Sequence, residues 1–334
     1  MSMMTYALAY DPENPRHDED PIEAAADVQR LYDSDVPFFT KDRIREANKS
    51  ILENNEPGKT ACIRDLDGRL TRFKVETGEV VNDSKDEEWI CDSVLEYVCI
   101  QNLLDQERLG GHSPYSNLRL VHLLEPRSQP AGPEANQREI HASLERDLDL
   151  WRDSQSWGKL KATLRGVSIA PVKKIVAFGL GSMREMPPVN RHFYQHALIL
   201  ALRQLLYGGR SRRIAEKEIK CYAQDPGYTE NDIAALQSCA VTAVPDPEGF
   251  LEVDEQTVVI SIYPNVPIRQ VISEISRPAV MIWNSIEGNG FGGVQCTDPD
   301  SPRLLRWIAE HYETLEFPHE PELFGELAVY VRRT

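Results

Sequence analysis

The feature that most constrains this chain is a regular alternation of apolar strands and amphipathic helices after residue 170. The expected strands are apolar along their whole length, which is typical of a parallel sheet covered by helices on both faces. Strands are expected at 173–178, 219–224, 240–244, 257–263, 279–285 and 326–333. Helices are expected at 190–207, 230–238, 268–276 and 301–313. The sequence therefore predicts an α/β fold with a Rossmann-like, doubly wound, mostly parallel sheet in a domain over residues 151–334.

Residues 1–150 lack this alternation and predict an N-terminal α+β extension that is ordered only in part. The expected elements are a helix at 40–53, a β-hairpin turned at Asp67-Gly68, a helix at 89–108 and a linker or surface loop at 125–139. Thr40 is the expected N-cap of the first helix. These elements offer too little apolar surface to fold alone, so we expect them to pack on the C-terminal domain or on a protein partner.

The formal net charge of −16 excludes free nucleic acid and anionic membranes as favoured partners, because both repel an acidic surface. Residues 1–150 carry 31 acidic and 17 basic side chains, so the excess is concentrated there. No apolar stretch approaches the roughly 18 residues of a membrane span, and the N-terminal residues do not resemble a secretory signal. The six cysteines form no Cys-x-x-Cys pair. We expect a cytoplasmic protein, with the nucleus as a second possibility.

A Gly-Leu-Gly-Ser turn directly follows the first strand of the expected sheet. The dinucleotide fingerprint requires a third glycine and an acidic residue about 20 positions later. Arg184 occupies the place of the third glycine, and an apolar helix lies where the acidic residue should be. A nicotinamide or flavin site is therefore poorly supported. The turn is either a purely structural feature or a loop that holds another ligand.

Several glycines and polar residues fall where the expected strands end, and ligands of open parallel sheets bind outside these carboxyl ends. The candidate site residues are Gly179, Gly181, Ser182, Asp225, Tyr263, Asn265, Asn284 and Ser285. Asp225 could accept hydrogen bonds from ribose hydroxyls, as in the adenosine pocket of S-adenosylmethionine-dependent methyltransferases. In the alternative interpretation Asp225 fixes the Asp-Pro turn or caps the next helix. The sequence does not identify a cofactor; S-adenosylmethionine or another adenosine-type ligand is the candidate that this layout offers.

No catalytic residue and no metal site is predicted. His192 and His196 are four residues apart on an expected helix and could share a face. Metal binding would need further ligands, and no Glu lies between them as in H-E-x-x-H. Solvated or capping roles are the expected ones for both histidines.

The order of these motifs resembles the SRR family, named for sensitivity to red light reduced. The carrying segments are "IVAFGLGSM", "FYQHALILALRQLL", "YAQDPGYTENDIAALQ", "VVISIYPNVP" and "VMIWNSI", over about residues 170–290. The "FFTKDRIREA" segment at 38–47 is similar to the leader of fungal members. The family's Pro-His-Cys-Pro segment is replaced here by Pro264-Asn265-Val266-Pro267, so metal or thiol chemistry assigned to it could not operate in this chain.

The resemblance implies signalling or regulation, with links to the circadian clock and to haem metabolism, and no established biochemical activity. Two hypotheses follow. The chain is a regulatory protein that senses a small ligand, or it is an adenosine-cofactor enzyme of the methyltransferase type. The missing dinucleotide fingerprint and the lack of an evident acid, base or nucleophile favour the first hypothesis. The layout of the strand ends supports the second.

Overall fold

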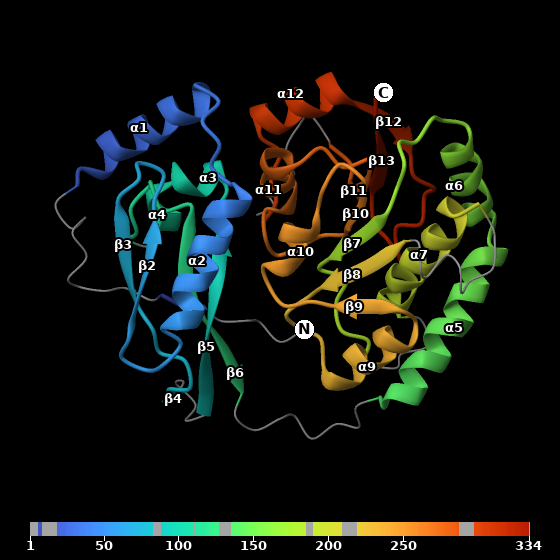
Figure 1. Cartoon of the computed structure of the whole chain (residues 1–334), viewed down its shortest axis with the longest axis horizontal. Coiled ribbons are helices and arrows are strands. Elements are labelled where there is room, and N and C mark those ends of the chain that lie inside the picture. The colour runs from blue at the N-terminus through green and yellow to red at the C-terminus, as the bar shows by residue number, and fades with distance from the viewer. Residues whose placement is uncertain are drawn as a thin grey trace. The chain divides into compact units, whose positions relative to one another are not determined.

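The structure is a computed structural model that describes residues 6–8, 19–82, 88–109, 111–126, 135–184, 190–208, 219–286 and 297–333. The chain divides into two compact units, Met1–Gly132 and Pro133–Thr334 (Figure 1).

The first unit combines helices with two antiparallel sheets. Its elements are β1 (Tyr6–Leu8), α1 (Pro21–Asp33), α2 (Lys41–Glu53), β2 (Thr60–Arg64), β3 (Leu70–Lys74), β4 (Val80–Asn82), β5 (Glu88–Tyr97), α3 (Ile100–Leu103), α4 (Gln106–Leu109) and β6 (Leu118–Pro126). Four strands form one sheet in the order β1-β6-β5-β4, and β2 and β3 form a separate hairpin. Helix α2 packs on β2, β5 and β6 through its buried residues Ile44, Ala47 and Ile51.

Two predictions for this unit are confirmed and one is wrong. Thr40 caps α2 by accepting a hydrogen bond from the Arg43 N–H (3.2 Å), and the hairpin turns at Gly68, whose φ of +85° suits glycine. The helix expected at 89–108 is instead the long strand β5 followed by two short helices. Strand β5 pairs with β6 along its length, and this long-range pairing overrides the local helical pattern.

The second unit is the predicted α/β domain. Its elements are α5 (Gln137–Asp153), α6 (Gln155–Arg165), β7 (Lys174–Phe178), α7 (Arg191–Leu206), β8 (Lys220–Gln224), α9 (Glu230–Ser238), β9 (Val241–Ala243), α10 (Glu248–Glu252), β10 (Thr257–Ser261), α11 (Ile268–Ile275), β11 (Val280–Asn284), α12 (Pro302–His311), β12 (Tyr312–Glu316) and β13 (Leu327–Arg332). The seven-stranded sheet has the order β12-β13-β11-β10-β7-β8-β9. Strands β9, β8, β7, β10 and β11 are parallel, whereas β13 is antiparallel to both of its neighbours. The prediction of a Rossmann-like, mostly parallel sheet is confirmed.

Helices cover both faces of this sheet, which explains why its strands are apolar throughout. Alternate strand residues, such as Ile175 and Ala177, contribute to one large core together with α5, α6, α7 and α9. The intervening residues face the other layer, where the Phe178 ring packs on Phe250 of α10 with ring centroids 4.9 Å apart. Figure 1 shows α10, α11 and α12 on that side.

Two boundaries differ from the sequence prediction, and part of a third lies outside the described residues. The helix expected at 301–313 ends at His311. Residues 312 and 313, which were expected to be helical, are the first two residues of strand β12. Helix α5 packs on α7 and α9, so the second unit starts before residue 151. Residues 127–134 of the expected linker lie outside the described residues.

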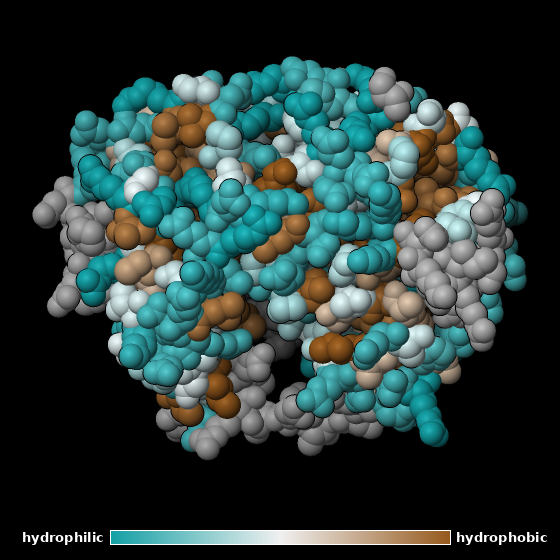
Figure 2. Space-filling view, in the orientation of Figure 1, coloured by the Kyte–Doolittle hydropathy of each residue, from teal (hydrophilic) through white to brown (hydrophobic). Residues whose placement is uncertain are grey.

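None of the described helices is long and apolar enough to cross a bilayer. Hydrophilic residues dominate the face shown in Figure 2, and apolar residues appear there as separate areas. The large hydrophobic side chains that are exposed belong to different elements of both units, among them Ile22 of α1, Leu150 of α5 and Ile233 of α9.

Candidate functional site

The candidate site is the carboxyl edge of the seven-stranded sheet, at the ends of β7, β8, β10 and β11. The chain proceeds from β7 to β8 in one direction across the sheet, and from β10 to β11 in the other. The order therefore reverses between the neighbouring strands β7 and β10. Ligands of doubly wound sheets bind at such a reversal point. All the residues predicted for the site follow these strands or end them.

The two glycines after β7 have a conformational reason to be glycine. Gly179 and Gly181 have φ values of +66° and +77°, in the left-handed region that other residues avoid. A Cβ atom at Gly179 would touch Pro264 in the loop after β10 at 3.4 Å. A Cβ atom at Gly181 would overlap the imidazole ring of His192. The space beside Gly181 is thus filled by a side chain of the protein itself.

Asp225 ties the loop after β7 to the loop after β8. One carboxylate oxygen accepts a hydrogen bond from the Gly181 N–H (2.7 Å), and the other accepts one from the Gly227 N–H (2.8 Å). Both oxygens are therefore engaged by the backbone. This arrangement is the turn-fixing alternative considered from the sequence, and a ribose would have to share these oxygens.

Asp232, which sequence reasoning missed, is the most heavily bonded carboxylate near this edge. It is fully buried, and it accepts hydrogen bonds from the Ser182 hydroxyl (2.6 Å) and the Met183 N–H (2.9 Å). It also closes a capping box with Thr229 at the start of α9. A Thr-x-x-Asp pattern before a helix is a readable signal for the capping role. The bonds to the glycine loop depend on the fold, and no local pattern shows them.

His192, His196 and Tyr228 form a chain of hydrogen bonds behind the loop. The Nδ1–H of His192 donates to the Leu180 carbonyl (2.6 Å), and the Nδ1–H of His196 donates to the His192 carbonyl (2.6 Å). The Tyr228 hydroxyl then donates to Nε2 of His196 (2.7 Å), which fixes the neutral tautomer. Burial lowers the pKa of His196 to about 4 and raises the pKa of Tyr228 well above its ordinary value. His196 is therefore a buried structural histidine, and the expectation of a solvated or capping role is wrong for it.

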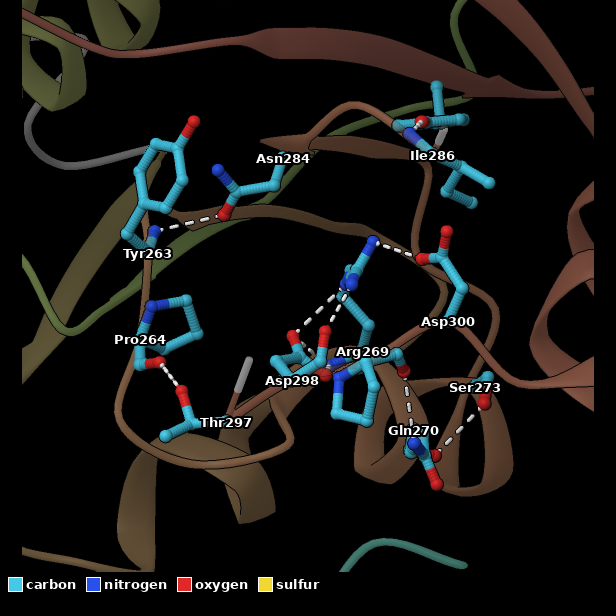
Figure 3. Close-up of polar contacts among 12 residues, drawn as sticks. Tyr263, Pro264, Arg269, Gln270, Ser273, Asn284, Ile286, Thr297, Asp298 and Asp300 are labelled. Carbon is cyan, nitrogen blue, oxygen red and sulfur yellow. Dashed lines mark hydrogen bonds and ion pairs between the residues drawn. The ribbon is translucent and has the colours of Figure 1, made fainter. Parts of the chain in front are cut away.

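Tyr263 and Asn284 are brought together at the ends of β10 and β11 (Figure 3). The Tyr263 N–H donates to Oδ1 of Asn284 (2.9 Å). Because an N–H must be accepted by an oxygen, this bond identifies which end of the Asn284 amide is Oδ1. The other end is therefore the NH2 group, Nδ2, which is a donor. Asn284 is 6% exposed, and Nδ2 has no hydrogen-bond partner among the described residues.

The remaining predicted residues have simpler surroundings. The Ser182 side chain bonds to Asp232, as described above, and the Ser285 N–H donates to the Glu326 carbonyl (3.0 Å) in the segment leading to β13. Asn265 is exposed in the loop after β10. The predicted residues thus fall into two groups, one around Asp225 and one around Asn284.

A buried ion cluster flanks the second group and was not predicted. Arg269, in the first turn of α11, binds Asp298 through its Nε (3.1 Å) and Asp300 through Nη1 (2.7 Å) (Figure 3). Burial raises the pKa of Asp298 to about 6, against the opposing effect of Arg269. The neighbouring Thr297 hydroxyl donates to the Pro264 carbonyl (2.5 Å). The segment that starts at residue 297 is thereby attached to α11 and to the loop after β10.

Within the described part of the chain, no three His, Cys, Asp or Glu side chains are grouped so that they could hold a metal ion.

Comparison with known proteins establishes the family. Residues 160–330 match the SRR1 domain. The chain belongs to the SRR1 domain family. The match runs from α6 through β7 to most of β13, so it extends beyond the 170–290 range in which the sequence motifs are recognised. No curated protein matches the chain.

The solved structures that match this chain include two methyltransferases of Haemonchus contortus. One is phosphoethanolamine N-methyltransferase 1 in complex with phosphoethanolamine and S-adenosylhomocysteine, with 10% identity, a TM-score of 0.25, and coverage of 60% of this chain and 51% of that chain. The other is phosphoethanolamine N-methyltransferase 2 in complex with phosphomonomethylethanolamine and S-adenosylhomocysteine, with 13% identity, a TM-score of 0.24, and coverage of 69% and 50%. The chain thus spans about half the length of these structures.

The two groups in the SRR1 domain differ in what they offer chemically. Around Asp225 and Asp232, the carboxylate oxygens accept hydrogen bonds from the loops after β7 and β8 and hold these loops in place. Around Asn284, a buried N–H donor is left over in the residue that binds the backbone of the half-exposed Tyr263. The second group is therefore the part of the strand ends with unused hydrogen-bonding capacity.

Proposed function

We propose that the SRR1 domain of this chain is a regulatory domain that binds a small molecule where β10 and β11 end, with an adenosine-type compound as first candidate. The observation that carries this proposal is the buried Nδ2 donor of Asn284. A buried amide without a partner costs about 1–3 kcal/mol, and native proteins retain few such groups without a reason. A ligand that accepts a hydrogen bond from Asn284 recovers this energy on binding.

Two further observations support a ligand at this end of the sheet. The hydroxyl of Ser261, the last residue of β10, is also buried and has no hydrogen-bond partner among the described residues. The site also adjoins the reversal of strand order between β7 and β10.

A thermal-shift screen tests the proposal. The full chain is melted with S-adenosylmethionine, S-adenosylhomocysteine, ATP, adenosine and porphobilinogen, and each hit is titrated by calorimetry. In Asn284→Asp one carboxylate oxygen can still accept from the Tyr263 N–H. At pH 8 the other oxygen is an acceptor in place of the amide N–H donor. We expect a hit that stabilises the wild type and loses about tenfold or more in affinity with this variant. The absence of any hit, or an unchanged affinity, would count against the proposal.

A methyltransferase is the second candidate, and the geometry of His192 supports it. Because Nδ1–H of this imidazole donates to the Leu180 carbonyl, the neutral ring carries its lone pair on Nε2, and the Nδ1 and Cε1 side of the ring lies against Gly181. A histidine held in this way can act as a general base. Binding of S-adenosylmethionine together with release of S-adenosylhomocysteine, lost in His192→Gln, would rank this function first.

A regulatory role also requires that the protein bind a partner to which it passes the signal. We propose that the first unit, which carries most of the net negative charge, provides it by binding a protein partner. Attraction to a basic partner surface would weaken as salt rises, because exposed charges are screened.

A further inference from the structure

Tyr263 combines a strained backbone with an exposed aromatic ring. It lies two residues after β10, its φ is +48°, and 49% of it is exposed. A bulky residue rarely adopts a left-handed backbone, and holding it there costs about 1–3 kcal/mol. Such strain persists only where the surrounding structure enforces it, and it is concentrated at functional sites.

The surroundings of Tyr263 fix both its backbone and its ring. Its N–H donates to Oδ1 of Asn284 (2.9 Å), and its hydroxyl accepts a hydrogen bond from the Glu326 N–H (3.1 Å). A Cβ atom at Gly325 would overlap the ring, so the tyrosine lies directly against that glycine. The ring is therefore immobilised against the segment before β13 while nearly half of the residue stays in contact with solvent.

The unused donor of Asn284 belongs to the same amide group that accepts from the Tyr263 N–H. Figure 3 shows the Asn284 amide nitrogen on the side on which the Tyr263 ring lies. Asn284 and Tyr263 are also joined by their own hydrogen bond, so the strain at Tyr263 places the ring and the donor together. A ligand that reaches both needs a flat face for the ring and an acceptor for the amide N–H.

We propose that Tyr263 is a preorganised stacking surface for a planar nitrogen heterocycle, whose acceptor binds Nδ2 of Asn284. This inference rests on the proposed ligand-binding function and specifies its ligand class. Aromatic side chains favour offset stacking on flat rings. Stacking of a nucleobase on an aromatic residue contributes about 1–3 kcal/mol to binding and does not depend on which base it is. A ring nitrogen presents its lone pair in the ring plane, which suits an N–H donor at the edge of the stack. Because Tyr263 is already fixed, binding does not have to immobilise it.

Two variants of Tyr263 separate stacking from a structural role. Tyr263→Asn removes the ring but tolerates the left-handed backbone, so it should melt at the wild-type temperature or above it. Tyr263→Phe keeps the ring and loses only the hydroxyl that accepts from Glu326. The probes are adenosine, S-adenosylmethionine and flavin mononucleotide, with ribose 5-phosphate as the matched compound without a heterocycle. Each is titrated into the full chain by calorimetry.

We expect at least one heterocyclic probe to bind the wild type, with ribose 5-phosphate at least about tenfold weaker. Affinity should fall about tenfold or more in Tyr263→Asn and stay within about threefold in Tyr263→Phe. Equal binding of a heterocycle to wild type and Tyr263→Asn would overturn the stacking role and leave the proposed ligand site intact. Equal binding of ribose 5-phosphate would overturn the ligand class. If no probe binds the wild type, both proposals fail.

Discussion

Gly181 is the position at which one added methyl group should have the clearest effect. Gly181→Ala introduces both a left-handed alanine and an overlap with the His192 ring. Gly208 is a matched control, because its φ is +80° and nothing lies within 4 Å of an added Cβ. We expect Gly208→Ala to lower the free energy of unfolding by about 1–2 kcal/mol, and Gly181→Ala to lower it by roughly 2–5 kcal/mol.

Urea denaturation of both variants measures this difference. Adding His192→Ala to Gly181→Ala should recover the part of the loss that is due to overlap, which a double-mutant cycle isolates. Equal losses at the two glycines would show that the loop moves away from His192 without cost.

His196 predicts a pH dependence of stability. Its pKa is about 4 in the folded domain, below the ordinary value of 6.5, because burial disfavours the charged form. The unfolded chain therefore binds a proton first as the pH falls, so stability decreases between pH 6.5 and 4. The loss from this residue is about 3 kcal/mol over that range.

Urea denaturation of the wild type and His196→Gln between pH 7.5 and 4.5 measures this effect. The difference between the two is needed, because Asp298, with a pKa raised to about 6, acts with the opposite sign. Stability from Asp298 is present at low pH and is lost as the pH rises from 3.8 to 6. Parallel curves for the two proteins would contradict the buried, neutral state of His196.

At the scale of elements, Asp225 decides how the loops after β7 and β8 are joined. An amide at this position still accepts from one backbone N–H, but it turns an NH2 group toward the other. We expect Asp225→Asn to cost about 1–2 kcal/mol in the free energy of unfolding. From the sequence alone a surface-like cost within about 1 kcal/mol is expected, so the two backbone bonds account for the difference.

The control for Asp225→Asn is Asp149→Asn, whose side chain is 78% exposed and should change stability by at most about 0.5 kcal/mol. Adenosine titration adds a second measurement. A loss of about tenfold in affinity with unchanged stability would return Asp225 to the ligand site.

Elements with strong local patterns were predictable, and those formed by distant pairing were not. The strands of the parallel sheet are apolar on both faces, so their sequence reveals them, and Asn190 and Thr229 mark the starts of α7 and α9. Strand β5 was mistaken for a helix, because its partner β6 is supplied by residues some 30 positions later. The same limit applies to the site. The positions after each strand are readable, but the bonds of Asp232 and the orphaned amide of Asn284 exist only in the fold.

At the scale of the whole molecule, the first unit contains two paired strands, β5 and β6, that the sequence does not predict. Because β5 and β6 were missed, the apolar surface of the first unit was underestimated. Their paired residues include the buried Leu95 and Leu120. We now expect residues 1–132 and 133–334, expressed separately, each to unfold in a single cooperative transition.

Circular dichroism of both fragments during urea denaturation tests this expectation. A cooperative transition of 133–334 with none for 1–132 would restore the sequence-based view that the first unit depends on the second unit or on a partner.

The position of β13 has a consequence for synthesis of the chain. This strand lies between β11 and β12, yet the ribosome releases it after both. Until residues 327–332 emerge, one edge of β11 has no partner strand and can pair with another nascent chain. Termination before this point would release a chain that has most of its core residues but leaves the edge of β11 without its partner strand β13. Premature termination near the end should therefore yield aggregated rather than partly active protein.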